Sequence, residues 1–125
     1  MFQTAKVMKQ IEPLYVNEIG MAFFWCEPEG VASDKVQMVF KETGFYFSRE
    51  ELMQFLVLID ETCYRNQTCG SCQVKAQCHK LLLKTPVSQI DLAVSMHELE
   101  HIKDLVEGAI FKAQLHDFVF GAGMN

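Results

Sequence analysis

Apolar and polar positions form the same order of elements twice along the chain: two short strands and then a helix. In the first stretch, residues 36–40 alternate in part between apolar and polar, residues 42–44 have the composition of a turn, and residues 45–47 are aromatic. In the second stretch, residues 80–84 and 90–94 are rich in aliphatic side chains, and Pro86 lies between them. Proline is confined to loops and sheet edges, so Pro86 marks the loop between the two later strands. Together with the turn at residues 42–44, the pattern predicts two antiparallel strand pairs.

Each strand pair is followed by a signal for the start of a helix. Glu51 follows Ser48, and Glu98 follows Ser95, at the spacing of a capping box, in which the two side chains satisfy free backbone N–H groups. We expect helices at about residues 49–64 and 96–115. One apolar stripe recurs at helical spacing in the second helix, comprising Leu99, Ile102, Leu105, Val106, Ala109, Ile110 and Ala113. The first helix has little polar face, so we expect it to be central or covered by a partner.

The two stretches also match position by position. The aligned pairs are Phe45/Leu92, Phe47/Val94, Ser48/Ser95, Glu51/Glu98, Leu52/Leu99, Phe55/Ile102, Leu58/Leu105 and Ile59/Val106. Any strand-to-helix junction shares some of these features, but a capping box within the matched pairs favours an internal duplication. The sequence therefore predicts one α+β domain over residues 1–125, with duplicated β-β-α units at 35–64 and 80–115 and a Cys-rich linker at 63–79. We expect one antiparallel sheet of four to five strands with the two main helices packed on it.

The two ends of the chain have weaker patterns. Residues 19–26 are apolar and aromatic, which predicts a short buried strand ended by Pro28 and Gly30. Residues 6–11 fit either a short helix or a strand. Residues 118–120 fit either a last edge strand or a docking tail.

Composition and charge narrow the classes of partner. The chain has 125 residues, with 16 acidic against 11 basic side chains, a net charge of −5 and no basic stripe. Because binding to phosphates requires clustered Lys and Arg, we expect no nucleic-acid partner and no attachment to an anionic membrane surface. No stretch approaches the roughly 18 apolar residues that span a bilayer, and no secretory signal is visible. We therefore expect the protein to be cytoplasmic.

Four of the five cysteines lie close together in the linker. Cys63, Cys69, Cys72 and Cys78 have the spacing C-x5-C-x2-C-x5-C, and His79 follows at once. Thiolates suit Zn²⁺ and iron–sulfur clusters, and the two-residue gap allows Cys69 and Cys72 to bind one ion. In the cytosol thiols stay reduced, so these residues are predicted metal ligands, with His79 in reserve. The alternative is a metal-free linker of reduced thiols, some of them buried as small apolar side chains.

The segment Cys69-x2-Cys72-x5-Cys78 resembles the cluster-binding segment of iron–sulfur nucleases related to RecB and of the auxiliary-cluster domains of radical enzymes. That resemblance covers about ten residues and implies an iron–sulfur cluster rather than an activity. Zinc sites more often use two close cysteine pairs, whereas this chain has one. Zinc, an iron–sulfur cluster and no metal therefore all remain open here.

A histidine pair lies in the predicted second helix. His97-Glu98-x-x-His101 resembles the zinc-binding helix of zincin metallopeptidases, which implies that both imidazoles bind zinc and that Glu98 activates a water molecule. Against this, Glu98 is already expected to cap the helix, and the pair is expected on the solvated face away from the apolar stripe. His116 and Glu107 are candidates for a third ligand by residue type only.

These observations lead to three functional hypotheses. The leading one is a non-enzymatic binding or regulatory protein, with one metal ion bound by the linker cysteines. The second is a small zinc hydrolase that uses His97, Glu98 and His101. The third is a metal-free scaffold that forms a homodimer or binds a protein partner through its first helix.

Overall fold

The computed structural model describes residues 10–67 and 80–121 and has an α+β fold. Its larger sheet is an antiparallel meander of β1 (Ile11–Val16), β2 (Gly20–Glu27), β3 (Gly30–Phe40) and β4 (Thr43–Ser48), in that order. Helix α2 (Arg49–Gln67) follows β4 without a loop. The Ser48 hydroxyl accepts the Glu51 N–H at 3.1 Å and the Glu51 carboxylate accepts the Ser48 N–H at 2.9 Å, so the predicted capping box is present.

The second half of the chain repeats the order of strand, strand and helix. β5 (Leu81–Lys84) and β6 (Asp91–Val94) form a separate two-stranded antiparallel sheet, and helix α4 (Met96–His116) follows. Ser95 and Glu98 form the second predicted capping box at the start of α4. The helix then widens into a π-helical turn, η1 (Asp117–Gly121).

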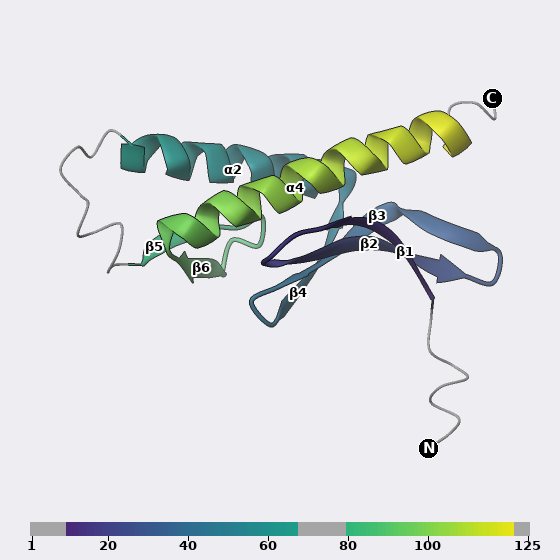
Figure 1. Cartoon of the computed structure of the whole chain (residues 1–125), viewed down its shortest axis with the longest axis horizontal. Helices are drawn as coiled ribbons and strands as arrows, with labels where there is room; N and C mark the ends of the chain where they lie inside the picture. The colour runs from purple at the N-terminus through teal and green to yellow at the C-terminus, as the bar shows by residue number, and fades with distance from the viewer. Residues whose placement is uncertain (1–9, 68–79, 122–125) are drawn as a thin grey trace, which may run out of the picture.

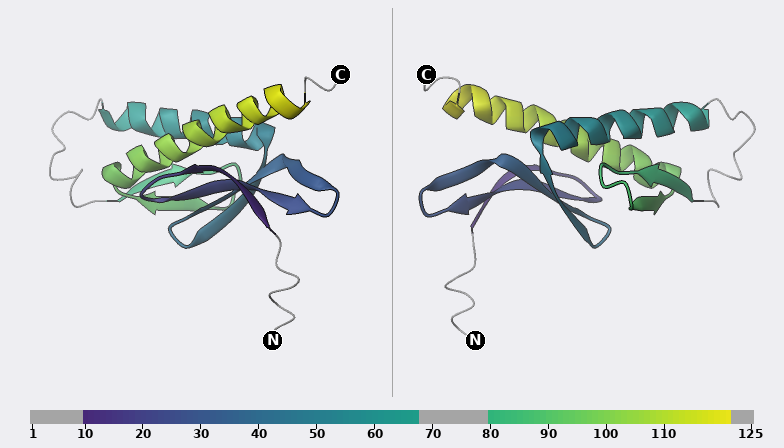
Figure 2. Two further views of the ribbon diagram at one scale, coloured as in Figure 1. Left: turned by 45° about the vertical axis from the view of Figure 1, so that its right-hand side comes forward. Right: turned by 180° about the vertical axis from the view of Figure 1, so that it is seen from behind.

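Both helices lie side by side over one face of the two sheets and run in opposite directions (Figure 1). The four-stranded sheet lies beneath the C-terminal half of α4, and the β5–β6 hairpin lies beneath its first turns (Figure 2). Two ion pairs join the helical layer: Arg49 at the start of α2 binds Asp117, the first residue of η1, and Lys103 of α4 binds Asp60 of α2 at 3.1 Å. The molecule therefore has two layers, with the core between them.

One apolar core fills the space between the layers. Its fully buried members include the sheet residues Phe24, Val36, Met38, Phe40, Leu83 and Val94 and the helix residues Leu52, Phe55, Ile59, Leu99, Ile102, Leu105 and Val106. The buried stripe of α4 is the predicted one, except that Ile110 is only partly buried. Leu52 and Leu99, which were aligned with each other in the sequence, are both buried in this core.

The prediction of one continuous sheet differs from the structure. Within the described residues, β5 pairs only with β6, and neither strand joins the four-stranded sheet. Two strands of four residues bury Leu83, Leu92 and Val94 against the helices, and this contact is enough to seat the hairpin without a neighbouring strand.

The turn between β3 and β4 lies earlier than predicted. Met38 pairs with Phe45 and Phe40 pairs with Thr43, so only Lys41 and Glu42 are left for the loop. This register keeps Phe40 and Phe45 on the core face, since a slip by one residue would turn both outward. Lys41 and Glu42 both adopt positive φ, at 51° and 61°, a backbone conformation that residues other than glycine rarely adopt.

Most of the segment 6–11, which fits either a short helix or a strand, lies outside the described residues. Residues 11–16 form β1, and the predicted strand at residues 19–26 is β2. Residues 118–120, predicted as an edge strand or a docking tail, instead continue α4 as part of η1. Among the described residues no helix has both the length and the apolar character required to cross a bilayer.

Candidate metal-binding site

The histidine pair lies in the first two turns of α4, where the capping box fixes the helix start. His97 and His101 are one turn apart, and their ring centroids are separated by 4.4 Å. His97 is exposed, whereas His101 is half-buried against the turn between β1 and β2. The expectation of a wholly solvated pair is therefore wrong for His101, because this turn packs over the beginning of α4.

The β1–β2 turn is attached to α4 by a set of polar contacts. The Asn17 side-chain oxygen accepts the N–H groups of Ile19 and Gly20, at 2.9 and 3.3 Å, which holds the turn closed. The Asn17 amide nitrogen donates to the backbone carbonyl of His101 at 2.9 Å. Asp104, one turn further along α4, accepts from the Tyr15 hydroxyl at 2.9 Å. The position of the turn relative to the histidines is therefore fixed from both sides.

Glu18 is the residue that this turn presents to the histidines. Its Oε1 lies 3.2 Å from Nε2 of His101. One ligand atom each from Glu18, His97 and His101 lies within 4.8 Å of the other two. The turn and the helix therefore bring together two imidazoles and one carboxylate, a donor set found in zinc sites and in sites for other first-row divalent metals.

The other ring nitrogen of His101 fixes the orientation of the imidazole. Nδ1 lies 2.9 Å from the backbone carbonyl of His97, which can only accept a hydrogen bond. Nδ1 therefore carries the proton in this contact, and in the neutral ring Nε2 has a free lone pair directed at Glu18. An N–H donated to a carbonyl is the usual second contact of a metal-binding histidine.

A small cavity of about 150 Å³ lies at this cluster. It is lined by Glu18, Ile19, His97, Glu98 and His101. Ile19 packs against the apolar core and provides a wall without competing polar atoms. The space accommodates an ion with water or another small ligand beside the protein donors.

Glu98 is adjacent to this cavity, but its carboxylate is engaged by other groups. Oε1 accepts the Ser95 N–H at 2.9 Å and pairs with Lys80 at 3.3 Å, while Oε2 pairs with Lys41 at 3.0 Å. The Ser95 N–H, followed by the two ammonium groups, lowers the pKa of Glu98 to about 2 against the opposing effect of partial burial. Glu98 thus holds the β3–β4 turn and the start of β5 to α4.

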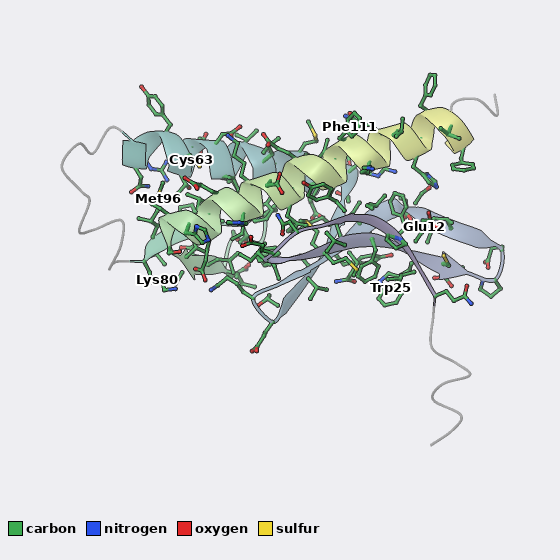
Figure 3. All side chains as sticks on the ribbon, in the orientation of Figure 1. Glu12, Trp25, Cys63, Lys80, Met96 and Phe111 are labelled. Atoms are coloured by element: carbon green, nitrogen blue, oxygen red, sulfur yellow. The ribbon has the colours of Figure 1, made fainter. Side chains whose placement is uncertain are left out.

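The predicted thiolate site falls mostly outside the described residues. Cys69, Cys72, Cys78 and His79 all lie between residues 68 and 79. Cys63 lies near the end of α2 and is half-buried against the apolar core (Figure 3). Burial raises the pKa of its thiol, an effect that Lys103 partly opposes. Cys63 is therefore partly packed against the core, and the metal site of the linker stays a prediction.

Comparison with known proteins adds nothing to this geometry. No protein-family model, no curated protein and no solved structure matches the chain. The site must be interpreted from its own residues.

Sequence reasoning found the two histidines and missed their third partner. The candidates for a third ligand, His116 and Glu107, lie further along α4. Neither of them belongs to the group of ligand atoms around His97 and His101. The only local signal for Glu18 was its position beside Asn17 in a turn, which is too common to indicate a ligand.

Proposed function

We propose that this chain is a non-enzymatic metal-binding protein whose ion is held by Glu18, His97 and His101. The observation that carries the proposal is the convergence of these three ligand atoms within 4.8 Å from a helix and a turn. The donor set favours Zn²⁺, with other first-row divalent ions as competitors.

The electrostatics of the His101–Glu18 contact support a bound cation. In the tautomer with a proton on Nδ1, Nε2 and the Glu18 carboxylate are both electron-rich and lie 3.2 Å apart. Two such atoms repel each other unless a positive charge lies between them or one of them is protonated. A divalent ion satisfies both atoms and adds the His97 imidazole as a third donor. Protons compete for the same position, so acid would release the metal.

The engaged carboxylate of Glu98 argues for binding without hydrolysis. A zincin-type mechanism requires this glutamate to take a proton from a metal-bound water molecule. Here the Ser95 N–H and two lysines surround it, and its pKa of about 2 makes it a weak base at neutral pH. The ion would instead tie the β1–β2 turn to α4 across the two layers of the fold.

The experiment is a Zn²⁺ titration by isothermal calorimetry on two complementary sets of variants. A Cys69→Ser, Cys72→Ser, Cys78→Ser triple variant removes three of the four predicted linker thiolates, keeps Cys63 packed on α2, and leaves the helix site intact. We expect this variant to bind one Zn²⁺, and we expect His101→Ala in the same background to bind none. Loss of all binding in the triple variant would assign the metal to the linker and refute the helix site.

We also propose that α2 associates with a second copy of the chain, in a reducing compartment such as the cytosol. Its outward face carries Met53, Val57 and Tyr64, which are 47%, 54% and 68% exposed. Apolar and aromatic side chains of this kind are enriched in the cores of homodimer interfaces. Sedimentation at micromolar concentration should give a dimer that Val57→Asp disrupts, and a wild-type monomer would refute the association.

The duplication of the two halves is a further proposal. It is supported by the recurrence of strand, strand and helix in β3–β4–α2 and β5–β6–α4. Both helices have a capping box, and the matched pairs Phe45/Leu92, Phe47/Val94, Leu52/Leu99, Phe55/Ile102 and Ile59/Val106 are buried in both halves. Ser48→Ala and Ser95→Ala should each lower the free energy of unfolding by about 1 kcal/mol. If the two variants lost very different amounts of unfolding free energy, the two serines would not have equivalent capping roles.

A further inference from the structure

A second cavity lies at the opposite end of α4 from the histidine pair, roughly 30 Å away along the helix. It has a volume of about 370 Å³, which is within the size range of pockets that bind small molecules. Its lining comprises Glu12, Val31 and Ser33 from β1 and β3, and His116, Asp117, Phe120 and Gly121 from the end of α4 and from η1. Figure 3 shows Glu12 on β1, beneath this end of the helix.

The π-helical turn gives the cavity its upper wall. At Asp117 the backbone N–H is shared between the carbonyls of Ala113 and Gln114, and the next residues follow the wider π-helical path. π-Helical turns are rare and occur frequently at functional sites. This turn places Asp117, Phe120 and Gly121 along one side of the cavity.

Arg49 fixes the frame around the cavity. Its guanidinium donates to both carboxylate oxygens of Asp117, at 2.6 and 2.8 Å, and to the backbone carbonyl of Ser33, at 2.7 Å from Nη2. One side chain thus connects the start of α2, strand β3 and η1. The charge of Asp117 is matched by this pair, and Arg49 lowers the pKa of the Asp117 carboxyl.

His116 lines the cavity, and its ring carries a buried polar atom without a partner among the described residues. Its ring lies between Phe24 and Phe120, with centroid distances of 5.0 and 4.8 Å. Its Nδ1 is buried and has no hydrogen-bond partner among the described residues. A buried nitrogen without a partner is unfavourable, and a ligand whose polar group meets Nδ1 when the ring turns toward the cavity would remove that cost.

The charges and walls of the cavity define the kind of ligand. Within the described part of the chain Glu12 forms no ion pair, so its carboxylate provides the unmatched negative charge of the lining. Val31 and Phe120 provide apolar wall. Ser33 and His116 add polar groups between the acidic side and the apolar side.

We propose that this cavity binds a small organic amine, a protonated primary amine carried on an aromatic or short aliphatic group. The ammonium group donates to the Glu12 carboxylate and the Ser33 hydroxyl, and to Nδ1 of His116 after the ring turns toward the cavity. The apolar body lies against Val31 and Phe120. This site uses none of the three proposed metal ligands, so amine binding can be tested independently of metal binding.

The test is a titration of the full chain with 2-phenylethylamine, followed by protein NMR, with 3-phenylpropanoate as an anionic probe of similar size. We expect the amine to bind about tenfold more tightly than the carboxylate, because Glu12 attracts one and repels the other. Amide shifts should concentrate at Val31, Ser33 and residues 116–121. Equal affinity for the two probes, or shifts centred elsewhere, would overturn the proposal.

Charge-neutralising variants separate direct contact from the net charge of the protein. Glu12→Gln should weaken amine binding about threefold to tenfold, whereas Glu61→Gln, at the far end of α2, should leave it unchanged. Equal effects of the two variants would show that only long-range charge attracts the amine, and would refute the site.

His116→Phe keeps an aromatic ring between Phe24 and Phe120 and removes Nδ1, and it should also weaken binding. If this variant does not fold, Ser33→Ala tests the same ammonium contact, and an unchanged affinity would contradict it.

Discussion

Nε2 of His101 lies 3.2 Å from Oε1 of Glu18, although the two residues are on different elements far apart in the sequence. The same imidazole directs Nδ1 at the backbone carbonyl of His97. The ring is therefore held with one nitrogen on a carbonyl and the other on a carboxylate. The contact of Nδ1 with a carbonyl matches the supporting hydrogen bond that metal-binding histidines make. The proposal of a metal-binding function rests on these two contacts of the His101 imidazole.

Asn17 supports the site without binding the ion, so its removal should weaken metal binding more than it weakens the fold. Its amide closes the β1–β2 turn and donates to the His101 carbonyl. Asn17→Ala should raise the Kd for Zn²⁺ about tenfold, as measured by calorimetry, because Glu18 is then less well positioned. The control is Asn66→Ala, which removes a side-chain bond to Thr62 near the end of α2. An unchanged Kd in Asn17→Ala would show that the turn is not part of the site.

Gly108 allows the close approach of β1 to α4, so a methyl group at this position should destabilise the protein. A Cβ there would lie 2.5 Å from atoms of the Tyr15 ring, which cannot move without displacing β1. Gly108→Ala should lower the free energy of unfolding by about 1–3 kcal/mol, although alanine is intrinsically the better helix former. In the control Gly121→Ala, the nearest atom, Cβ of Asp117, would lie 4.0 Å from the new methyl group. Denaturant unfolding that ranks the two variants equally would contradict this packing.

The sequence was sufficient to predict what depends on local spacing. Both capping boxes, both helices and the buried stripe of α4 follow from residues within a few positions of one another, and the structure confirms them. The pairing of His97 with His101 follows from the helical repeat in the same way.

The proposed third ligand, Glu18, could not be predicted, because its position depends on how the layers pack. Glu18 reaches His101 only because Tyr15 and Asn17 dock the β1–β2 turn on α4. Those contacts join the first described strand to the last helix, and no sequence spacing encodes them. The π-helical turn at Asp117 was missed for a similar reason. Asp117 forms an ion pair with Arg49, which lies on another helix, and no local spacing indicates that contact.

Glu98 should make the stability of the metal-free protein depend on pH. Its folded-state pKa of about 2 lies below its ordinary value of 4.5, so its contribution is complete above pH 4.5 and is lost as the pH falls toward 2. In the presence of a chelator, Glu98→Gln should cost about 1–3 kcal/mol at pH 7, and the difference from wild type should shrink steadily below pH 4.5. Denaturant unfolding at a series of pH values measures this difference. A gap that stays constant between pH 6 and pH 3 would show that the carboxylate is not held as described.

The central claim is tested most directly by the ring nitrogens of the histidines themselves. The chain has four histidines, so a ¹⁵N spectrum of the imidazoles can be recorded before and after one equivalent of Zn²⁺ is added. We predict large shifts at Nε2 of His101 and at the His97 ring, with Nδ1 of His101 still protonated and with His116 unchanged. If the rings of His97 and His101 keep their metal-free shifts while Zn²⁺ binds elsewhere, the metal site at Glu18, His97 and His101 does not exist.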